Sequence, residues 1–470
     1  MTLRRRETLA LTGAFLAGLA GCAGTTTRET TTDGPATADT TTDDPETTTE
    51  EDDPGFEDLD VPPFPEIDPV TDPEISEDLL ADQIRGNVEF SLDLLAVLRE
   101  EHDENLFVSP YSVSVALAMT YAGARGNTEQ EMADALNFVL EQDDLHPAFG
   151  SLEAEFERRN EDGQDANVPG PDEDEDAGPA FEFNTANAVW GQEGYPFRDD
   201  FFDLLDAYYG AGLTLVDFEG DPEAARQRIN EWVAAETNDR IEDLLPAGSI
   251  DETTRLVLTN AIYFTARWRY PFEEEKTESR PFTALDGTTT EGPTMHQSIE
   301  TKYAEIDGHQ LVELPYANGQ TSMVVVLPAE GKFESFEEQF TVDRLAVMLE
   351  QAGTALMDLA LPKLEIESEF SLVEAMRALG MQDAFGGGAD FSGMVEGGGL
   401  FVDDIVHQSF VSVDELGTEA AAATAVVTAD SAPTKHVEMT VDRPFLFYIR
   451  DQPTETPLFV GRVIDAPSGE

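Results

Sequence analysis

The chain contains very little cysteine and few basic residues. Cys22 is the only cysteine among 470 residues, so no disulfide can form within the chain. Only 27 lysines and arginines stand against 97 aspartates and glutamates, which gives a net charge of −70. This sign disfavours nucleic-acid binding, because phosphates carry the same charge. A compact fold with this charge repels itself unless molar salt shortens the Debye length to about 3 Å. The composition therefore indicates adaptation to high salt, with a docking surface for a cationic partner or loose calcium binding as alternatives.

The motifs that usually indicate an enzyme are also missing. The sequence has no G-x-S-x-G elbow, no H-E-x-x-H pair and no glycine-rich phosphate loop. Its six histidines are scattered, and none has the spacing of a metal site: His102, His146, His296, His309, His407 and His436. We therefore expect no catalytic residues, no metal and no cofactor.

The length and hydrophobicity are those of a chain with a substantial core. Forty per cent of the 470 residues are hydrophobic, enough to build one large or several small domains. Amphipathic patterns at 83–99 and 223–238 predict helices, whereas 323–327 and 445–449 are strand-like. This mixture predicts an α+β fold.

The N-terminus has the features of an export signal. Three arginines at positions 4–6 precede a short apolar core at 14–20, which is too short to span a membrane as a stable helix. The arginine pair fits twin-arginine export. The residues Leu19-Ala20-Gly21-Cys22 resemble a lipoprotein processing box, which makes Cys22 the lipidated first residue of the mature chain. An incidental cleavage site beside a stray cysteine is the alternative.

Two polar segments divide the rest of the chain. Residues 23–75 are rich in Thr, Asp, Glu and Pro, which predicts a disordered tether that spaces a domain from the membrane. A second acidic stretch, at about 160–179, is interpreted as an enlarged surface loop of that domain. The predicted organisation is an export signal with lipobox at 1–22, a tether at 23–75 and a single domain at 76–470.

Residues 413–432 form a long stretch of small residues without proline. Read with a period of two, Thr418, Ala420 and Ala422 fall on one uncharged face, while Glu419 falls on the other. No proline interrupts the stretch before Pro433, so the pattern predicts a strand able to enter a sheet. Gly417 is expected to act as a hinge, because glycine adopts backbone angles closed to other residues. Four consecutive alanines also suit a helix or a surface loop, which is the alternative.

Several motifs in series resemble the serpin family. The stretch Glu415-x-Gly417-Thr418-Glu419 and the alanines after it resemble the serpin reactive-loop hinge. Further blocks that resemble the family follow in the expected order between residues 79 and 463: N-x-F-x-S-P-x-S at 105–112, Asn187-Ala-Val-Trp190, Thr259-Asn260, Leu361-Pro362-Lys363, His407-Gln408-Ser409-Phe410, Arg443-Pro444-Phe445 and Pro457-Leu458-Phe459. The high ratio of arginine to lysine resembles secreted haloarchaeal proteins.

The resemblance implies a fold and a set of site residues. The expected fold has a large central β-sheet, surrounding helices, smaller sheets and an exposed reactive-centre loop. By resemblance, Ser109, Ser112, Asn260 and His407 form a hydrogen-bonded shutter under the large sheet, and Trp268 lies at the breach where insertion begins. The hinge residues implied in the same way are Glu415, Gly417, Thr418, Glu419, Ala420, Ala421, Ala422, Ala423 and Thr424.

The resemblance also implies inhibition of a protease by suicide-substrate trapping. The scissile bond is expected near Ser431-Ala432, within about two residues. Small residues before it suit a subtilisin-like or elastase-like serine protease. A trypsin-like enzyme is disfavoured, because no Lys or Arg lies between Val411 and Pro433. A cysteine protease is a further alternative. The competing hypothesis is a non-inhibitory serpin-fold binding protein at the cell surface.

Overall fold

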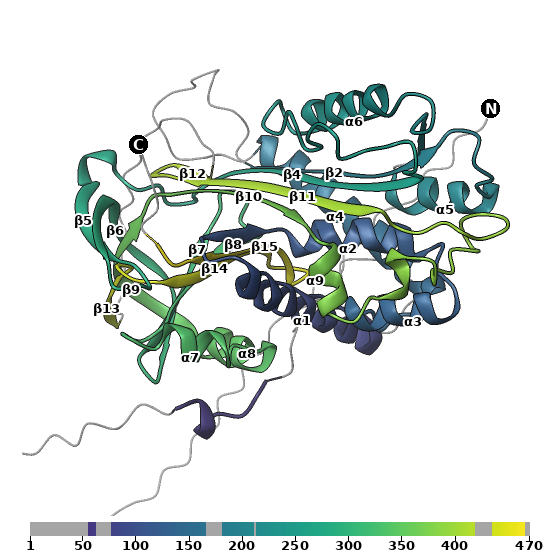
Figure 1. Cartoon of the computed structure of the whole chain (residues 1–470). Coiled ribbons are helices and arrows are strands. Elements are labelled where there is room, and N and C mark those ends of the chain that lie inside the picture. The colour runs from purple at the N-terminus through teal and green to yellow at the C-terminus, as the bar shows by residue number, and fades with distance from the viewer. Residues whose placement is uncertain (1–54, 63–76, 166–180, 211–212, 419–434, 466–470) are drawn as a thin grey trace, which may run out of the picture. The chain divides into compact units, whose positions relative to one another are not determined.

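The computed structural model describes residues 55–62, 77–165, 181–210, 213–418 and 435–465 (Figure 1). Within these residues the α-helices are α1 Glu77–Glu101, α2 Pro110–Tyr121, α3 Gly126–Ala135, α4 Gln142–Asp165, α5 Asp199–Tyr209, α6 Pro222–Glu236, α7 Phe333–Glu337, α8 Val342–Gln351 and α9 Val373–Ala378. Short 3-10 helices are η1 Phe56–Asp58, η2 Glu274–Lys276 and η3 Asp383–Phe385. None of the described helices is both long and apolar enough to cross a membrane.

The strands in the described ranges form two sheets. They are β1 Leu106–Val108, β2 Phe181–Gln192, β3 Thr214–Val216, β4 Leu256–Arg267, β5 Glu278–Thr283, β6 Thr289–Ile306, β7 His309–Pro315, β8 Thr321–Leu327, β9 Gly353–Pro362, β10 Leu364–Ser371, β11 Asp404–Val413, β12 Gly417–Thr418, β13 His436–Thr440, β14 Phe445–Asp451 and β15 Thr456–Val463. The nine-stranded sheet has the order β1-β15-β14-β8-β7-β6-β9-β13, with β5 paired to β6. The six-stranded sheet has the order β10-β11-β12-β4-β2-β3.

The six-stranded sheet contains an unusual junction between β11 and β4. These two strands run parallel and pair directly from Asp404 with Val257 to Ser409 with Ile262. Beyond that point they separate, and the two-residue strand β12 lies between them, antiparallel to both. We call the direct contact between β4 and β11 the seam. The seam has a narrow gap at one end that already accepts a strand.

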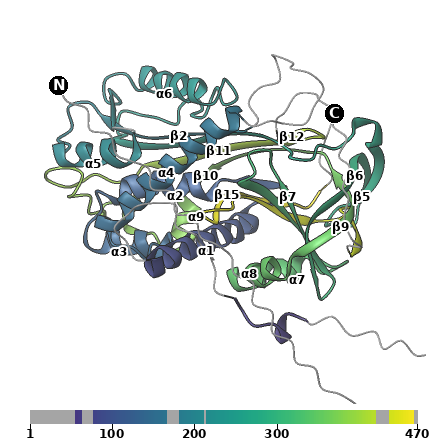
Figure 2. The same cartoon turned by 180° about the vertical axis from the view of Figure 1, so that it is seen from behind.

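Helices cover both faces of this sheet. Every residue of α2 is buried, because the helix contacts β2 and β4 of the six-stranded sheet as well as β15 of the other sheet. On the opposite face lies α6, whose Ile229 and Val233 pack in a cluster with Trp190 and Val257 (Figures 1 and 2). A strand that entered the seam would therefore be buried on both faces, which requires small or apolar side chains.

The predicted elements agree well with the observed ones. The helices expected at 83–99 and 223–238 are α1 and α6, and the strands expected at 323–327 and 445–449 are β8 and β14. Ser109 caps α2 by accepting a hydrogen bond from the Ser112 amide at 3.2 Å, with Pro110 at the first helical position. The α+β prediction is confirmed.

The structure describes only part of each of the two polar segments, and the predicted domain boundaries stay predictions. Helix α4 continues to Asp165, so the first residues of the acidic stretch at 160–179 are helical. The Asn160 side chain both donates to the Phe183 carbonyl and accepts from the Phe183 amide, each at 2.9 Å, which fastens this turn to β2. Within the expected tether, Phe56–Asp58 form η1 rather than unstructured chain. Residues 166–180 lie outside the described part.

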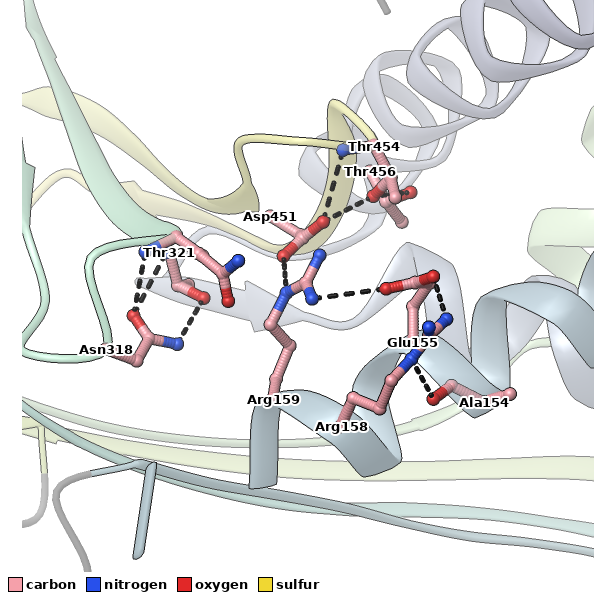
Figure 3. Close-up of polar contacts among 10 residues, drawn as sticks. Ala154, Glu155, Arg158, Arg159, Asn318, Thr321, Asp451, Thr454 and Thr456 are labelled. Atoms are coloured by element: carbon pink, nitrogen blue, oxygen red, sulfur yellow. Dashed lines mark hydrogen bonds and ion pairs between the residues drawn. The ribbon is translucent and has the colours of Figure 1, made fainter. Parts of the chain in front are cut away.

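A buried ion pair fastens the last turns of α4 to the nine-stranded sheet (Figure 3). Arg159 Nε lies 3.0 Å from Asp451 Oδ1, and Arg159 Nη1 lies 3.2 Å from Glu155 Oε2. The other carboxylate oxygen of Asp451 accepts from the Thr454 amide and hydroxyl. Pairing and hydrogen bonding offset much of the cost of burying these charges, although Arg159 Nη2 has no hydrogen-bond partner among the described residues. The ion pair holds α4 against the turn between β14 and β15.

Candidate functional site

The chain makes a tight turn after β11 and enters the gap at the end of the seam. The Asp414 amide donates to the Gly417 carbonyl at 2.9 Å, and Asp414 Oδ1 accepts from the amides of Leu416 and Gly417. This turn places Thr418 opposite Val413 of β11 and Ala266 of β4. At residues 417 and 418 the strand prediction is therefore confirmed and the helix alternative is wrong.

Gly417 is required by space rather than by backbone angles. Its φ lies outside the left-handed region, which differs from the expectation that it adopts angles closed to other residues. A Cβ at this position would lie 2.1 Å from the Ala266 carbonyl oxygen and 2.6 Å from Arg267 Cα. Both are backbone atoms of β4, which cannot move aside without breaking the sheet. Glycine allows the turn to approach β4 closely.

Thr418 is completely buried in this gap. Its hydroxyl lies 2.8 Å from the Tyr316 hydroxyl, and its carbonyl accepts from Thr265 Oγ1 at 3.1 Å. Burial raises the pKa of Tyr316, which keeps this hydroxyl neutral. The side chain that the sequence assigns to the inward face thus does point inward, and its one polar atom has a partner.

Trp268 lies against the same turn. Its indole Nε1 donates to the Asp414 carbonyl at 3.0 Å, and its amide donates to the Leu416 carbonyl at 2.8 Å. The indole stacks on the Tyr316 ring with centroids 4.6 Å apart and planes inclined by 4°. Residues 414–418 therefore lie against the stacked side chains of Trp268 and Tyr316.

Glu415 carries a nearly buried charge at the turn. Its carboxylate lies 2.7 Å from Lys363 Nζ and accepts from Thr277 Oγ1 at 2.5 Å. Burial opposes ionisation, but the bonds to Lys363 and Thr277 outweigh it and lower the pKa of Glu415. Lys363 directly follows β9, so this ion pair joins the turn to the start of β10.

The four residues expected to form a shutter come together beneath the seam. Asn187, Asn260 and His407 stand in one row across β2, β4 and β11, because Asn187 pairs with Asn260 and Asn260 pairs with His407. Ser109 and Ser112 reach this row from the start of α2. We call these five residues the seam cluster.

Hydrogen bonds connect the whole seam cluster. Asn260 Nδ2 donates to Ser112 Oγ and to Asn187 Oδ1, each at 2.7 Å, and Ser112 Oγ donates to Asn187 Oδ1 at 2.8 Å. His407 Nδ1 is hydrogen-bonded to Asn260 Oδ1 across the seam. Ser109 Oγ donates to the Leu458 carbonyl at 2.7 Å. The His407–Asn260 bond is thus the side-chain link of this cluster that joins β11 to β4.

The protonation state of His407 follows from its surroundings. Its Nε2 accepts from the Ser109 amide at 3.3 Å, so the ring proton resides on Nδ1 and is donated to Asn260 Oδ1. Burial lowers the pKa of His407 to about 3 and outweighs the hydrogen bond to Asn260, which acts in the opposite direction. The ring is therefore neutral at any pH near 7 and acts as a fixed donor and acceptor.

Sequence reasoning missed five members of this site. Asn187 is part of the block Asn187-Ala-Val-Trp190, but nothing in one sequence shows that β2 places it beside Asn260. Tyr316, Thr265, Thr277 and Lys363 are far from the turn in sequence and reach it only through the fold. Among the described residues, no group of three His, Cys, Asp or Glu side chains is arranged to hold a metal ion.

Several predicted site residues lie outside the described part of the chain. These are Cys22, the hinge residues Glu419, Ala420, Ala421, Ala422, Ala423 and Thr424, and the expected reactive bond Ser431-Ala432. Their expected roles stay predictions.

Comparison with known proteins identifies the class. The sequence profile of the family described as "Serpin (serine protease inhibitor)" matches residues 85–466. An uncharacterized serpin-like protein of Thermococcus kodakarensis is 37% identical over 383 residues, which cover 81% of this chain and 85% of that protein. The leukocyte elastase inhibitor of Equus caballus is 37% identical over 388 residues, which cover 80% of this chain and 97% of that protein.

Solved structures have the same fold. The thermophilic serpin tengpin in its native state has a TM-score of 0.71 at 29% identity, covering 83% of this chain and 95% of tengpin. Uncleaved ovalbumin has a TM-score of 0.70 at 26% identity, covering 82% of this chain and all of ovalbumin. The chain belongs to the serpin family, which is described as a family of serine protease inhibitors and not of enzymes.

Proposed function

We propose that this chain inhibits serine-type endopeptidases by offering its reactive loop as a substrate and then inserting the cleaved loop into the six-stranded sheet. The observation that carries the proposal is the position of Thr418, which is fully buried between β11 and β4 at the open end of the seam. A strand that continues from Thr418 along the seam has uncharged residues at the inward positions as far as Thr428, with the small residues Ala420 and Ala422 first.

The seam determines both the free energy gained when the loop inserts and the barrier that opposes insertion. An inserted strand would pair with β4 and β11 on both sides and would be covered by α2 and α6. It would also move β4 and β11 from about 4.8 Å to about twice that distance apart, which breaks the bond between His407 and Asn260. The native form is therefore held by a kinetic barrier, and the seam cluster is part of that barrier.

The chemical step belongs to the protease. The hydroxyl oxygen of the protease serine attacks the carbonyl carbon of the residue before the scissile bond, near Ser431. The C–N bond to the next residue, near Ala432, breaks; the new amine leaves with the proton relayed by the protease histidine. The loop is then an ester of the enzyme, and its insertion carries the protease away before water hydrolyses the ester. Insertion adds a strand to the sheet, so main-chain hydrogen bonds stabilise the inserted loop.

The expected target has a small or permissive primary pocket. Thr428, Ala429 and Ser431 are small, which suits a subtilisin-like or elastase-like protease. The similarity to leukocyte elastase inhibitors supports the elastase-like alternative. Inhibition of a cysteine protease is the further alternative.

We also propose where the inhibitor acts. The signal at 1–22 exports the chain, and Cys22 carries a lipid that holds it on the extracellular face of the membrane. The charge of −70 suits a protein that works in molar salt. Mass spectrometry of the N-terminal peptide of the mature protein tests this, since an unmodified Cys22 excludes the anchor.

The test of inhibition is incubation with subtilisin and pancreatic elastase in molar salt, followed by denaturing electrophoresis. We expect a covalent complex that survives boiling in detergent, and the first residue of the released C-terminal peptide locates the scissile bond. The variant Thr418→Arg should be cleaved at the same bond without forming a complex, because a charged side chain cannot enter the gap that buries Thr418. Thr290, which is exposed on β6 of the other sheet, offers the matched control Thr290→Arg, because it adds the same side chain where no loop enters. Complete cleavage without any complex refutes the proposal for these proteases.

A binding protein is the second candidate function. Its support is the similarity to thyroxine-binding globulin in complex with thyroxine, at 26% identity and a TM-score of 0.71. The two candidates differ in their response to loop cleavage. Insertion predicts a large rise in the melting temperature of the cleaved chain, whereas an unchanged melting temperature favours the binding protein.

A further inference from the structure

Part of the expected tether is folded onto the domain. Residues 55–62, in the sequence GFEDLDVP, lie within the tether predicted at 23–75. Phe56 and Leu59 pack against the main hydrophobic core. The tether predicted at 23–75 is therefore not a spacer along its whole length.

The segment has an inward face and an outward face. Phe56, Leu59 and Pro62 are partly buried, and their spacing of three residues places them on one side of a 3-10 or polyproline-like chain. Glu57, Asp58, Asp60 and Val61 are exposed. The acidic side chains thus point away from a domain of the same charge, which is the arrangement a docking segment in this chain requires.

A hairpin turn supplies the main acceptor. Asp307 and Gly308 connect β6 to β7, and both have positive φ, as the tight hairpin turn requires. The turn presents the Asp307 carboxylate, whose Oδ2 accepts from the Phe56 amide at 3.1 Å. A Cβ on Gly55 would lie 2.6 Å from Asp307 Oδ1, so a larger residue would push the carboxylate out of its bonding position.

The Phe56 ring has a cation and an aromatic ring as neighbours. The Arg344 guanidinium carbon lies 5.0 Å from the ring centroid, within the range of a cation–π interaction. Arg344 is held there by a bond to Gln339 Oε1 at 2.8 Å. On another side the His309 ring lies 6.2 Å away, and its Nδ1 accepts from the Ala329 amide.

Leu59 extends the contact toward β9. It forms one wall of a polar cavity of about 220 Å³, whose other walls come from the end of β6, from residues 353–355 and from Lys435. The segment thus contacts the β6–β7 turn and α8, and Leu59 lines the same cavity as the start of β9 and Lys435.

We propose that residues 55–62 are an intramolecular docking segment that clamps the tether onto the β6–β7 turn and α8. The β6–β7 turn and α8 thus bind a segment of the same chain, and the feature that they bind is the aromatic ring of Phe56, which follows Gly55. The spacer between the export signal and the domain then ends at residue 54. Molar salt favours the clamp, because it screens the repulsion between acidic segment and acidic domain while leaving the apolar contacts intact.

Hydrogen exchange of the full exported chain in molar salt tests the clamp. The amides of Phe56 and Asp58, which are bonded to Asp307 and Gly55, should exchange at least about tenfold more slowly than in a free peptide of residues 50–62. Phe56→Ala and Gly55→Ala should abolish this protection. Val61→Ala is the matched control, because Val61 is 51% exposed on the outward face of the same segment.

A cross-link gives an independent readout. Leu59→Cys and Thr354→Cys place two thiols on the same cavity, and Cys22→Ser removes the only other thiol. A short bis-maleimide should join them within one chain, and adding Phe56→Ala should reduce the yield severalfold. Exchange at the free-peptide rate in the unmodified chain, or equal cross-linking with and without Phe56, overturns the proposal. Neither readout depends on protease inhibition or on lipidation.

Discussion

The His407–Asn260 bond is expected to control how fast the native form converts to the loop-inserted form. His407→Ala removes the side-chain bond that crosses the seam. Ser409→Ala is the matched control on the same strand: Ser409 is also fully buried, but its hydroxyl donates to the Phe107 carbonyl of β1 at 2.7 Å and does not cross the seam.

The size of the effect follows from the hydrogen bonds. Loss of a buried bond costs about 1 kcal/mol, and a buried group left without a partner costs about 1–3 kcal/mol more. In His407→Ala these groups are Asn260 Oδ1 and the Ser109 amide. The His407–Asn260 bond across the seam contributes about 1.5 kcal/mol of this stabilisation, and the unmodified chain also loses that contribution when β4 and β11 separate. Removing it from the native form therefore lowers the barrier by about that amount, which is roughly a tenfold faster conversion.

The assay follows spontaneous conversion of the uncleaved protein. Each variant is held in molar salt below its unfolding temperature, and the fraction that has become resistant to thermal unfolding is measured over time. We expect His407→Ala to convert about tenfold faster than the unmodified chain, and Ser409→Ala to stay within about twofold of it. The reasoning is refuted if the two variants convert equally fast, because the direction of the lost bond would then not matter.

Three further predictions concern the turn and the buried histidines. Lys363→Met should lower the free energy of unfolding by about 2 kcal/mol, measured in denaturant, because it leaves the buried Glu415 carboxylate with only a neutral donor. Adding Glu415→Gln to this variant should restore most of the loss. The ion pair would be contradicted if the double variant lost the sum of what the two single variants lose. Gly417→Ala should raise the exchange rate of the Thr418 amide at least about tenfold, because the new Cβ meets the backbone of β4; unchanged exchange would contradict the steric argument. Burial lowers the pKa of His146 to about 4 and that of His407 to about 3, so below pH 6.5 the unfolded chain binds more protons than the folded one. Each histidine should therefore contribute a fall of about 2 kcal/mol between pH 7.5 and 5, while Glu153, whose pKa burial raises to about 7, contributes in the opposite direction. His146→Gln should lose about 2 kcal/mol less than the unmodified chain over this pH range, measured by the denaturant midpoint, and an equal loss in the two proteins would contradict the buried neutral histidine.

The sequence by itself determined the features that depend on neighbouring residues. Ser109 followed by Pro110 fixes the start of α2, because one supplies the cap and the other needs no amide partner. The strand-like runs at 323–327 and 445–449 predict strands, and β8 and β14 are found there. The series of motifs identified the serpin family, and the single cysteine excluded an internal disulfide. All of these are local patterns, or local patterns in a fixed order.

Only the tertiary structure decided which distant residues meet. Asn187 joins the seam cluster because the register of β2 against β4 places it beside Asn260, and a shift of one residue would turn it to the other face. Gly417 is needed because β4 passes close to the turn, which backbone preference could not reveal. In the sequence, Phe56 is a single aromatic residue in an acidic segment, and only the fold shows that the Asp307 turn and Arg344 bind it. Each depends on contacts between segments distant in sequence, which composition and periodicity do not encode.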